Sequence, residues 1–138
     1  MTSTTRRVEN NTRTMLRILL VEDHPQLAEE LRTTLEELVD AHIVATAAAE
    51  ADACACMDGR TNGCDVVIID IFLRKGSGLG VLRHMAAHER PPQRVVLTNY
   101  ATLDMRSRCR ALGADAVFDK STEVDELIDW LDMTKVRH

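Results

Sequence analysis

The sequence contains no apolar run that approaches the roughly 20 residues needed for a membrane-spanning helix. Its first eleven residues also lack the apolar stretch of a secretory signal peptide. We therefore expect a cytoplasmic protein without membrane contact. Lys and Arg number 17 against 22 Asp and Glu, a formal net charge of −5. This balance disfavours direct nucleic-acid binding, because such surfaces carry clustered Lys and Arg.

The sequence also lacks the Cys and His spacings of a structural zinc site. Its cysteines are Cys54, Cys56, Cys64 and Cys109. We interpret all four as reduced thiols that pack as small apolar groups. The histidines are scattered, and none is assigned to catalysis: His24, His42, His84, His88 and His138.

Three common phosphate-handling classes fail on their motifs. Residues 74–80 contain glycines, but not in the order of a P-loop, which ends in Lys followed by Ser or Thr. Glu22-Asp23-His24-Pro25 occupies the place where a dinucleotide-binding fold needs Gly-x-Gly-x-x-Gly. A haloacid-dehalogenase-type phosphatase carries a second Asp two residues after its nucleophile, and here, after Asp70, that place is Phe72.

What the sequence does contain is a regular alternation of short apolar runs and amphipathic stretches. Its 138 residues, 45% of them hydrophobic, suit one domain with one core. We predict strands at residues 17–21, 42–46, 65–70, 94–98 and 114–119. We predict helices at about 25–39, 48–57, 79–88 and 102–112, the last of these ended by Gly113 with positive φ.

The first predicted helix has Leu27, Leu31, Leu35 and Leu38 on one face. A final helix has one apolar face and Ser121 or Thr122 as its N-cap, the apolar positions being Val124, Leu127, Ile128 and Leu131. Residues 1–15 are expected to form a flexible tail, residues 16–134 the domain and residues 135–138 a short C-terminal tail. Five consecutive βα units predict an α/β fold, a parallel sheet with helices on both faces.

Chemically useful side chains follow the predicted strands at their carboxyl ends. Glu22 and Asp23 follow the first strand, Asp70 closes the third, Thr98 closes the fourth and Lys120 follows the fifth. Parallel strands end at one edge of their sheet, where ligands bind in such folds. Three carboxylates, a hydroxyl and an ammonium suit a divalent cation and a phosphoryl group, with one carboxylate as the nucleophile.

These residues resemble the receiver domain of two-component response regulators. The likeness is carried by the stretches ILLVEDHPQLAEEL, DVVIIDIFLRKGSGLGVL, VVLTNYA and ALGADAVFDKST, and it spans residues 17 to about 132. The resemblance implies a flavodoxin-like, doubly wound, five-stranded parallel sheet of order 2-1-3-4-5 with five helices. It also implies a signalling phosphoacceptor that catalyses only its own phosphorylation and dephosphorylation.

In this family pattern, Asp70 accepts the phosphoryl group from a histidine kinase or histidine phosphotransfer protein. Mg²⁺ is held by Asp23, Asp70 and the backbone carbonyl of Phe72, with Glu22 binding directly or through water. Thr98 and Lys120 hold phosphoryl oxygens. The resemblance also implies that the signal passes to a downstream protein, which binds the face formed by the fourth helix, the fifth strand and the fifth helix. It further implies a monomer or a phosphorylation-dependent dimer.

The sequence departs from the family pattern at three positions. Val117 occupies the place of the usual Tyr or Phe three residues before the lysine, and Phe118 is expected on the opposite face of the sheet. Ser121 replaces the usual proline after the lysine, and Arg74 replaces a common proline after Asp70. Three alternatives stay open: a phosphorylation-independent interaction module, a receiver fragment of a longer DNA-binding regulator, and a small Mg²⁺-dependent phosphatase.

Overall fold

The computed structural model describes residues 15–60 and 64–137, in which five strands and five helices alternate. The strands are β1 (Leu16–Val21), β2 (Ala41–Ala47), β3 (Val66–Ile69), β4 (Gln93–Thr98) and β5 (Ala116–Asp119). The helices are α2 (Pro25–Leu38), α3 (Glu50–Arg60), α4 (Gly78–Ala86), α5 (Leu103–Ala111) and α6 (Val124–Arg137). All ten predicted elements are present, with ends shifted by a few residues.

The described residues cover little of the predicted N-terminal tail and most of the predicted C-terminal tail, residues 135–138. Of the N-terminal tail, residues 1–15, all but Met15 lie outside them. Helix α6 continues to Arg137, past the predicted domain end at residue 134. No described helix combines the length and the apolarity needed to cross a membrane.

The strands form one parallel sheet in the order β2-β1-β3-β4-β5, which confirms the predicted topology. The central strand β3 is buried along its whole length, as its unbroken Val and Ile sequence predicts. Its last residue, Ile69, lies between Val21 of β1 and Val96 of β4. The carboxyl ends of these strands therefore meet along one edge.

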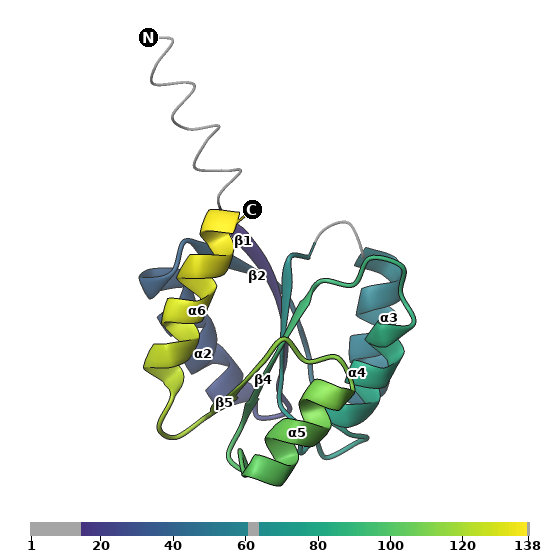
Figure 1. The fold of residues 1–138 in the computed structure, drawn as a ribbon. Coiled ribbons are helices and arrows are strands. Elements are labelled where there is room, and N and C mark those ends of the chain that lie inside the picture. The colour runs from purple at the N-terminus through teal and green to yellow at the C-terminus, as the bar shows by residue number, and fades with distance from the viewer. Residues whose placement is uncertain (1–14, 61–63, 138) are drawn as a thin grey trace, which may run out of the picture.

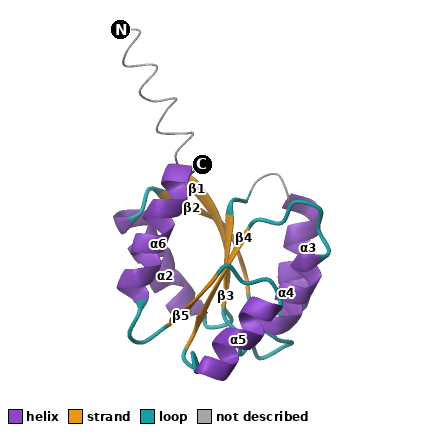
Figure 2. Cartoon of the chain, in the orientation of Figure 1, coloured by secondary structure: helices purple, strands orange, loops and turns teal. Residues whose placement is uncertain are grey.

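The helices cover the two faces of the sheet unequally, with α2 and α6 on one side and α3, α4 and α5 on the other (Figures 1 and 2). Each side has its own apolar core. Val117 belongs to the core beneath α3, α4 and α5, whereas Phe118 packs into the core beneath α2 and α6. The predicted opposite orientation of these neighbours is confirmed.

All four cysteines are free, as predicted. Cys64 and Cys109 are buried, and the Cys64 thiol donates a hydrogen bond to the Val66 carbonyl (3.1 Å). Burial raises the pKa of Cys64 to about 11. This thiol is therefore neutral near neutral pH and serves as core filling.

Two predicted details of helix structure are wrong. Leu38 was placed on the buried face of α2, but it is the last residue of the helix and is largely exposed. Ser121 and Thr122 were candidate N-caps, but α6 begins at Val124. The reason is an Asx turn, in which Asp119 Oδ1 accepts hydrogen bonds from the N–H groups of both residues (2.7 and 3.1 Å).

The structure also defines two details of the turns, the first of which was predicted. Gly113 follows α5 with φ of 104°, so the predicted left-handed helix end is confirmed. The Lys120–Ser121 bond is trans, as are the other described peptide bonds.

Gly78 lies where the first turn of α4 crosses the end of β3. A Cβ atom at this position would overlap the backbone carbonyl oxygen of Asp70. Because the overlap is with backbone, no side-chain rotation can relieve it. Ser77 fixes the same approach as the N-cap of α4, its Oγ accepting a hydrogen bond from the Leu79 N–H (3.1 Å). Because Gly78 has no side chain, the start of α4 can lie directly against the end of β3.

We expect Gly78→Ala to lower the free energy of unfolding by about 1–3 kcal/mol, since the added methyl group must displace backbone. Gly59→Ala is the matched control, because Gly59 lies in helix α3 with nothing within 4 Å of its missing Cβ. That change should raise the free energy of unfolding by roughly 0.5 kcal/mol. Urea denaturation of both variants measures the difference. Equal stabilities would contradict the steric role of Gly78.

Candidate functional site

The carboxyl edge of the sheet is built by backbone hydrogen bonds that continue the strand ladders beyond the last paired residues. The Glu22 N–H donates to the Ala47 carbonyl (2.9 Å), and the Asp70 N–H donates to the Val21 carbonyl (3.0 Å). The Lys120 N–H donates to the Thr98 carbonyl (2.9 Å). The backbones of Glu22, Asp70 and Lys120 are therefore fixed by a neighbouring strand.

Lys120 is the centre of the site. Its Nζ donates to Glu22 Oε1 at 2.6 Å and to Asp70 Oδ2 at 3.2 Å. The side chains of Lys120, Glu22 and Asp70 are only 10%, 3% and 12% exposed. A buried charge without a partner is strongly unfavourable, so these three groups depend on one another.

Burial raises the pKa of Asp70, and repulsion from Glu22 raises it further, against the opposing attraction of Lys120. For Lys120, burial alone would lower the pKa. The hydrogen bond that Lys120 donates to Glu22 and the charges of both carboxylates outweigh burial, so the pKa of Lys120 is raised. One ammonium thus faces two carboxylates, and the local charge is negative. Such a site favours an additional cation.

The carboxylates have the arrangement and the chemistry of a magnesium site. Glu22, Asp23 and Asp70 each offer an oxygen, and these atoms lie within 4.8 Å of one another. Hard oxygen donors at a negatively charged edge are the ligands that Mg²⁺ prefers. Asp23 also contacts the loop that follows Asp70, because its Oδ2 accepts a hydrogen bond from the Arg74 N–H (2.8 Å). The residues present therefore fit Mg²⁺.

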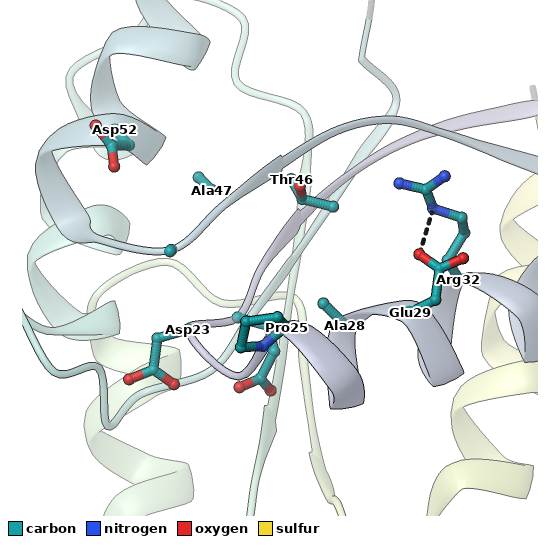
Figure 3. A pocket seen from close by; sticks show the side chains of 10 residues that line it. Asp23, Pro25, Ala28, Glu29, Arg32, Thr46, Ala47 and Asp52 are labelled. Carbon is teal, nitrogen blue, oxygen red and sulfur yellow. Dashed lines mark ion pairs between the residues drawn. The ribbon is translucent and has the colours of Figure 1, made fainter.

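A hollow of about 440 Å³ opens beside the acidic pair, between the start of α2 and the β2–α3 turn (Figure 3). Glu22 and Asp23 lie at one end, and the ion pair between Arg32 and Glu29 (3.6 Å) borders it further along α2. Both acidic residues line this hollow, but the Glu22 side chain is only 3% exposed whereas that of Asp23 is 15% exposed.

Thr98 joins the site from the end of β4 and is fully buried. Its hydroxyl accepts a hydrogen bond from the Tyr100 N–H (3.2 Å), and its carbonyl holds Lys120. The Tyr100 ring meets the Phe72 ring edge-on, with centroids 4.7 Å apart. Although both rings are more than half exposed, they join the two loops that follow Asp70 and Thr98.

The loop after Asp70 is held by contacts that the sequence analysis missed. Glu50 reaches from the start of α3, and its Oε1 accepts the Ser77 N–H (2.9 Å) while its own N–H donates to the Lys75 carbonyl (3.1 Å). Arg74 supplies an N–H to Asp23 that the usual proline lacks. No pattern in the sequence signals the Glu50 contact, because it joins segments 27 residues apart.

Arg106 of α5 forms a second unpredicted set of contacts, near the position of the absent aromatic. Its guanidinium donates to the carbonyls of Ala101 (2.9 Å) and Val117 (3.0 Å) and to Glu123 Oε1 (2.7 Å). Glu123 Oε1 also accepts the Asp119 N–H (2.8 Å). We call Arg106 and Glu123 with these contacts the Arg106 bracket. It connects the loop after β4 to the end of β5.

All the residues predicted for the site lie at the predicted edge. Glu22, Asp70 and Lys120 are in direct contact, Asp23 lies with the other carboxylates, and Thr98 is attached through its backbone. Phe72 lies two residues after Asp70, in the same loop. Its backbone N–H is near enough to the Asp70 carboxyl to lower the pKa of that group. The carbonyl predicted for Phe72 as a metal ligand stays a prediction.

The sequence and the structure were compared with known proteins. Residues 18–132 match the family model of the response regulator receiver domain. Response regulator UvrY of Escherichia coli (strain K12) is 26% identical over 114 residues, which cover 83% of this chain and 51% of that protein. The same figures hold for UvrY of Shigella flexneri. The chain thus spans about half the length of the curated relatives it matches.

Solved structures show the same fold. A two-component response regulator of the LuxR family from Aurantimonas sp. SI85-9A1 superposes with a TM-score of 0.80 at 24% identity, covering 90% of this chain and 87% of that one. A chain from the complex of CheX and CheY with BeF3 and Mg from Borrelia burgdorferi gives 0.77 at 18% identity, covering 89% and 90%. With the family model matched along most of its length, the chain belongs to the receiver-domain family of response regulators.

Proposed function

We propose that this receiver accepts a phosphoryl group on Asp70 from a phosphohistidine of a histidine kinase or histidine phosphotransfer protein. The observation that supports this most is the contact of Lys120 with both Glu22 and Asp70, beside Asp23. It combines a partly buried nucleophile, a cation that can move onto a phosphoryl oxygen and carboxylates able to hold a metal. The proposed role is signalling, with no turnover of a separate substrate.

In the proposed reaction, an oxygen of the Asp70 carboxylate forms a bond to phosphorus while the bond from phosphorus to the donor imidazole nitrogen breaks. The released imidazole keeps the electron pair and takes a proton. Phosphoryl transfer of this kind depends mainly on positioning and charge neutralisation. Lys120 and the Thr98 hydroxyl stabilise the phosphoryl oxygens, and the backbone N–H of Phe72 is a further donor beside Asp70.

Glu22, Asp23, Asp70 and the backbone carbonyl of Phe72 are the proposed ligands of Mg²⁺. When bound, Mg²⁺ supplies positive charge that offsets the carboxylates and the phosphoryl oxygens. Glu22 is the more buried of the two carboxylates and is paired with Lys120, whereas the side chain of Asp23 is 15% exposed. We therefore assign Asp23 the larger share of metal binding and Glu22 the positioning of Lys120.

The Phe72 and Tyr100 rings are proposed to slow hydrolysis of the aspartyl phosphate. They come two residues after Asp70 and after Thr98, and they contact each other edge-on. A ring pair there narrows the path by which water approaches phosphorus in line. The phosphorylated state should therefore be comparatively long-lived.

The output is proposed to leave through the face of α5, β5 and α6. Because no large ring occupies position 117, the usual aromatic rotation has no counterpart there. The Arg106 bracket supplies another connection, since it binds Ala101 at one end and Val117 and Glu123 at the other. When Thr98 moves toward the phosphoryl group, the attached loop displaces the bracket and with it the start of α6.

A second candidate is a receiver module of a longer DNA-binding regulator, favoured by the match to only half of UvrY. The chemistry at Asp70 would be the same, but the downstream partner would be an attached domain. A phosphorylation-independent interaction module is the third candidate. The paired Lys120, Glu22 and Asp70 favour phosphorylation over it.

Incubation with acetyl phosphate and Mg²⁺ should add one phosphoryl group, detected by intact-protein mass spectrometry. Chelation of Mg²⁺ should abolish the addition, and Asp70→Asn should abolish it because an amide is not a nucleophile. Asp65→Asn is the matched control at the other end of the same strand, where the carboxylate caps the Arg17 N–H (2.9 Å). Equal labelling of Asp70→Asn and the parent would refute the acceptor assignment.

Phe72→Asn and Tyr100→Ala should each shorten the lifetime of the phosphorylated protein several-fold, since either change opens the path for water. Phosphoryl loss is followed over time by mass spectrometry after removal of the donor. Leu103→Ala is the control, because Leu103 is an exposed apolar residue in the same part of the chain. Unchanged lifetimes for both ring variants would show that the rings do not screen the acyl phosphate.

Beryllofluoride, a phosphoryl mimic, should shift amide NMR signals most in residues 99–110 and 116–122, and much less in α3. In Arg106→Gln the shifts in residues 116–122 should shrink, because the bracket is lost, while those in 99–103 remain. Arg108→Gln, an exposed arginine of the same helix, should behave as the parent. Full shifts at 116–122 in Arg106→Gln would show that the coupling takes another route.

A further inference from the structure

A second group of metal-binding side chains lies outside the receiver site, between α3 and α4. His84 is in the last turn of α4, and His88 follows four residues later, in the turn after this helix. Asp58 comes from α3. Its Oδ1 lies 2.8 Å from His84 Nε2 and 3.2 Å from His88 Nε2. Both imidazoles thus present the same ring nitrogen to one carboxylate oxygen.

The geometry of these atoms matches a three-ligand metal site. Ligand atoms that are each about 2.0–2.1 Å from a tetrahedral zinc ion lie roughly 3.3 Å apart, slightly farther than the two observed N–O distances. All three ligand atoms lie within 4.8 Å of one another. The two rings are edge-on with centroids 5.4 Å apart, so they converge without stacking. A small shift of the exposed Asp58 carboxylate would admit the ion.

The type of ligand separates this group from the receiver site. Glu22, Asp23 and Asp70 offer only hard oxygen donors, whereas here two imidazole nitrogens join a single carboxylate. Imidazole favours zinc and neighbouring transition metals over Mg²⁺. The two imidazoles are 37% and 19% exposed and Asp58 is 57% exposed, so an ion in solution can reach all three.

We propose that Asp58, His84 and His88 form a binding site for a borderline divalent transition-metal ion of the zinc class, with water completing the coordination. The ion would join α3 to the end of α4. The opposite end of α4 starts at Gly78, directly after the loop that follows Asp70. The proposed site is therefore separate from the phosphoryl chemistry, yet it anchors a helix whose first turn contacts the acceptor residue.

The test is a titration of the untagged 138-residue protein with Zn²⁺ in millimolar Mg²⁺, in which isothermal titration calorimetry measures the binding. We expect one equivalent to bind with micromolar or tighter affinity and to raise the melting temperature. His84→Gln/His88→Gln should abolish this binding. Asp58→Asn should lower the Zn²⁺ affinity by more than about tenfold. Removing a group that only hydrogen-bonds a metal ligand already costs at least about that much affinity. Co²⁺ should give a visible absorption spectrum with the parent but not with His84→Gln/His88→Gln.

Two controls test other possible zinc ligands in the chain. His42→Gln removes a histidine that pairs with Glu36 (3.3 Å), and Cys54→Ser/Cys56→Ser removes the two partly exposed thiols. Both should bind Zn²⁺ as the parent does. The circular dichroism spectrum of each variant checks folding, which the exposed position of the site should preserve. No saturable binding by the parent, or undiminished binding by the double histidine variant, overturns the proposal and leaves the three groups as a hydrogen-bonded contact only.

Discussion

The contact of Lys120 with Glu22 and Asp70 is the constraint to which the rest of this receiver is adjusted. Lys120 and Glu22 are 98 positions apart in the sequence, and their charged groups meet at 2.6 Å with little exposure to water. Removing one partner would leave a charge buried without compensation. The strands β1, β3 and β5 must therefore end at the same edge, with β4 between the last two. The sheet order and register achieve this.

The loops around this contact are fixed by groups that come from other elements. Glu50 of α3 holds the loop after Asp70, and Gly78 lets α4 start directly against the Asp70 carbonyl. Arg74 contributes a backbone N–H to Asp23. Because these contacts converge on the residues that follow Asp70, the Asp70 carboxylate is positioned by the loop as well as by its strand.

The absence of a large aromatic at position 117 is accompanied by a polar connection at the same place. Val117 is part of the apolar core, and its carbonyl accepts a hydrogen bond from Arg106. A guanidinium has several donors in a rigid plane, so one side chain can bind two carbonyls and a carboxylate at once. The bracket therefore joins β5, α5 and the loop after β4 by directional bonds where a ring would join them by packing.

Hydrophobic periodicity was enough to predict the elements and their order, because each pattern is local. The unbroken Val and Ile residues of β3 identified a doubly buried strand, and the polar residues at the strand ends identified Glu22, Asp23, Asp70, Thr98 and Lys120 as one edge. The opposite orientation of Val117 and Phe118 also followed from strand alternation alone. The order of the strands in space required the family resemblance in addition.

Contacts between distant segments were decided only by the tertiary structure. The Asx turn at Asp119 displaced the start of α6 from the predicted caps, and the partners of Glu50 and Arg106 left no local pattern. The spacing of His84 and His88 was visible in the sequence, but it acquired meaning only when α3 brought Asp58 to both rings. Sequence by itself determined which side chains each element carries and toward which face. Packing of the helices on the sheet determined which of them meet, because their separation in space is independent of their separation along the chain.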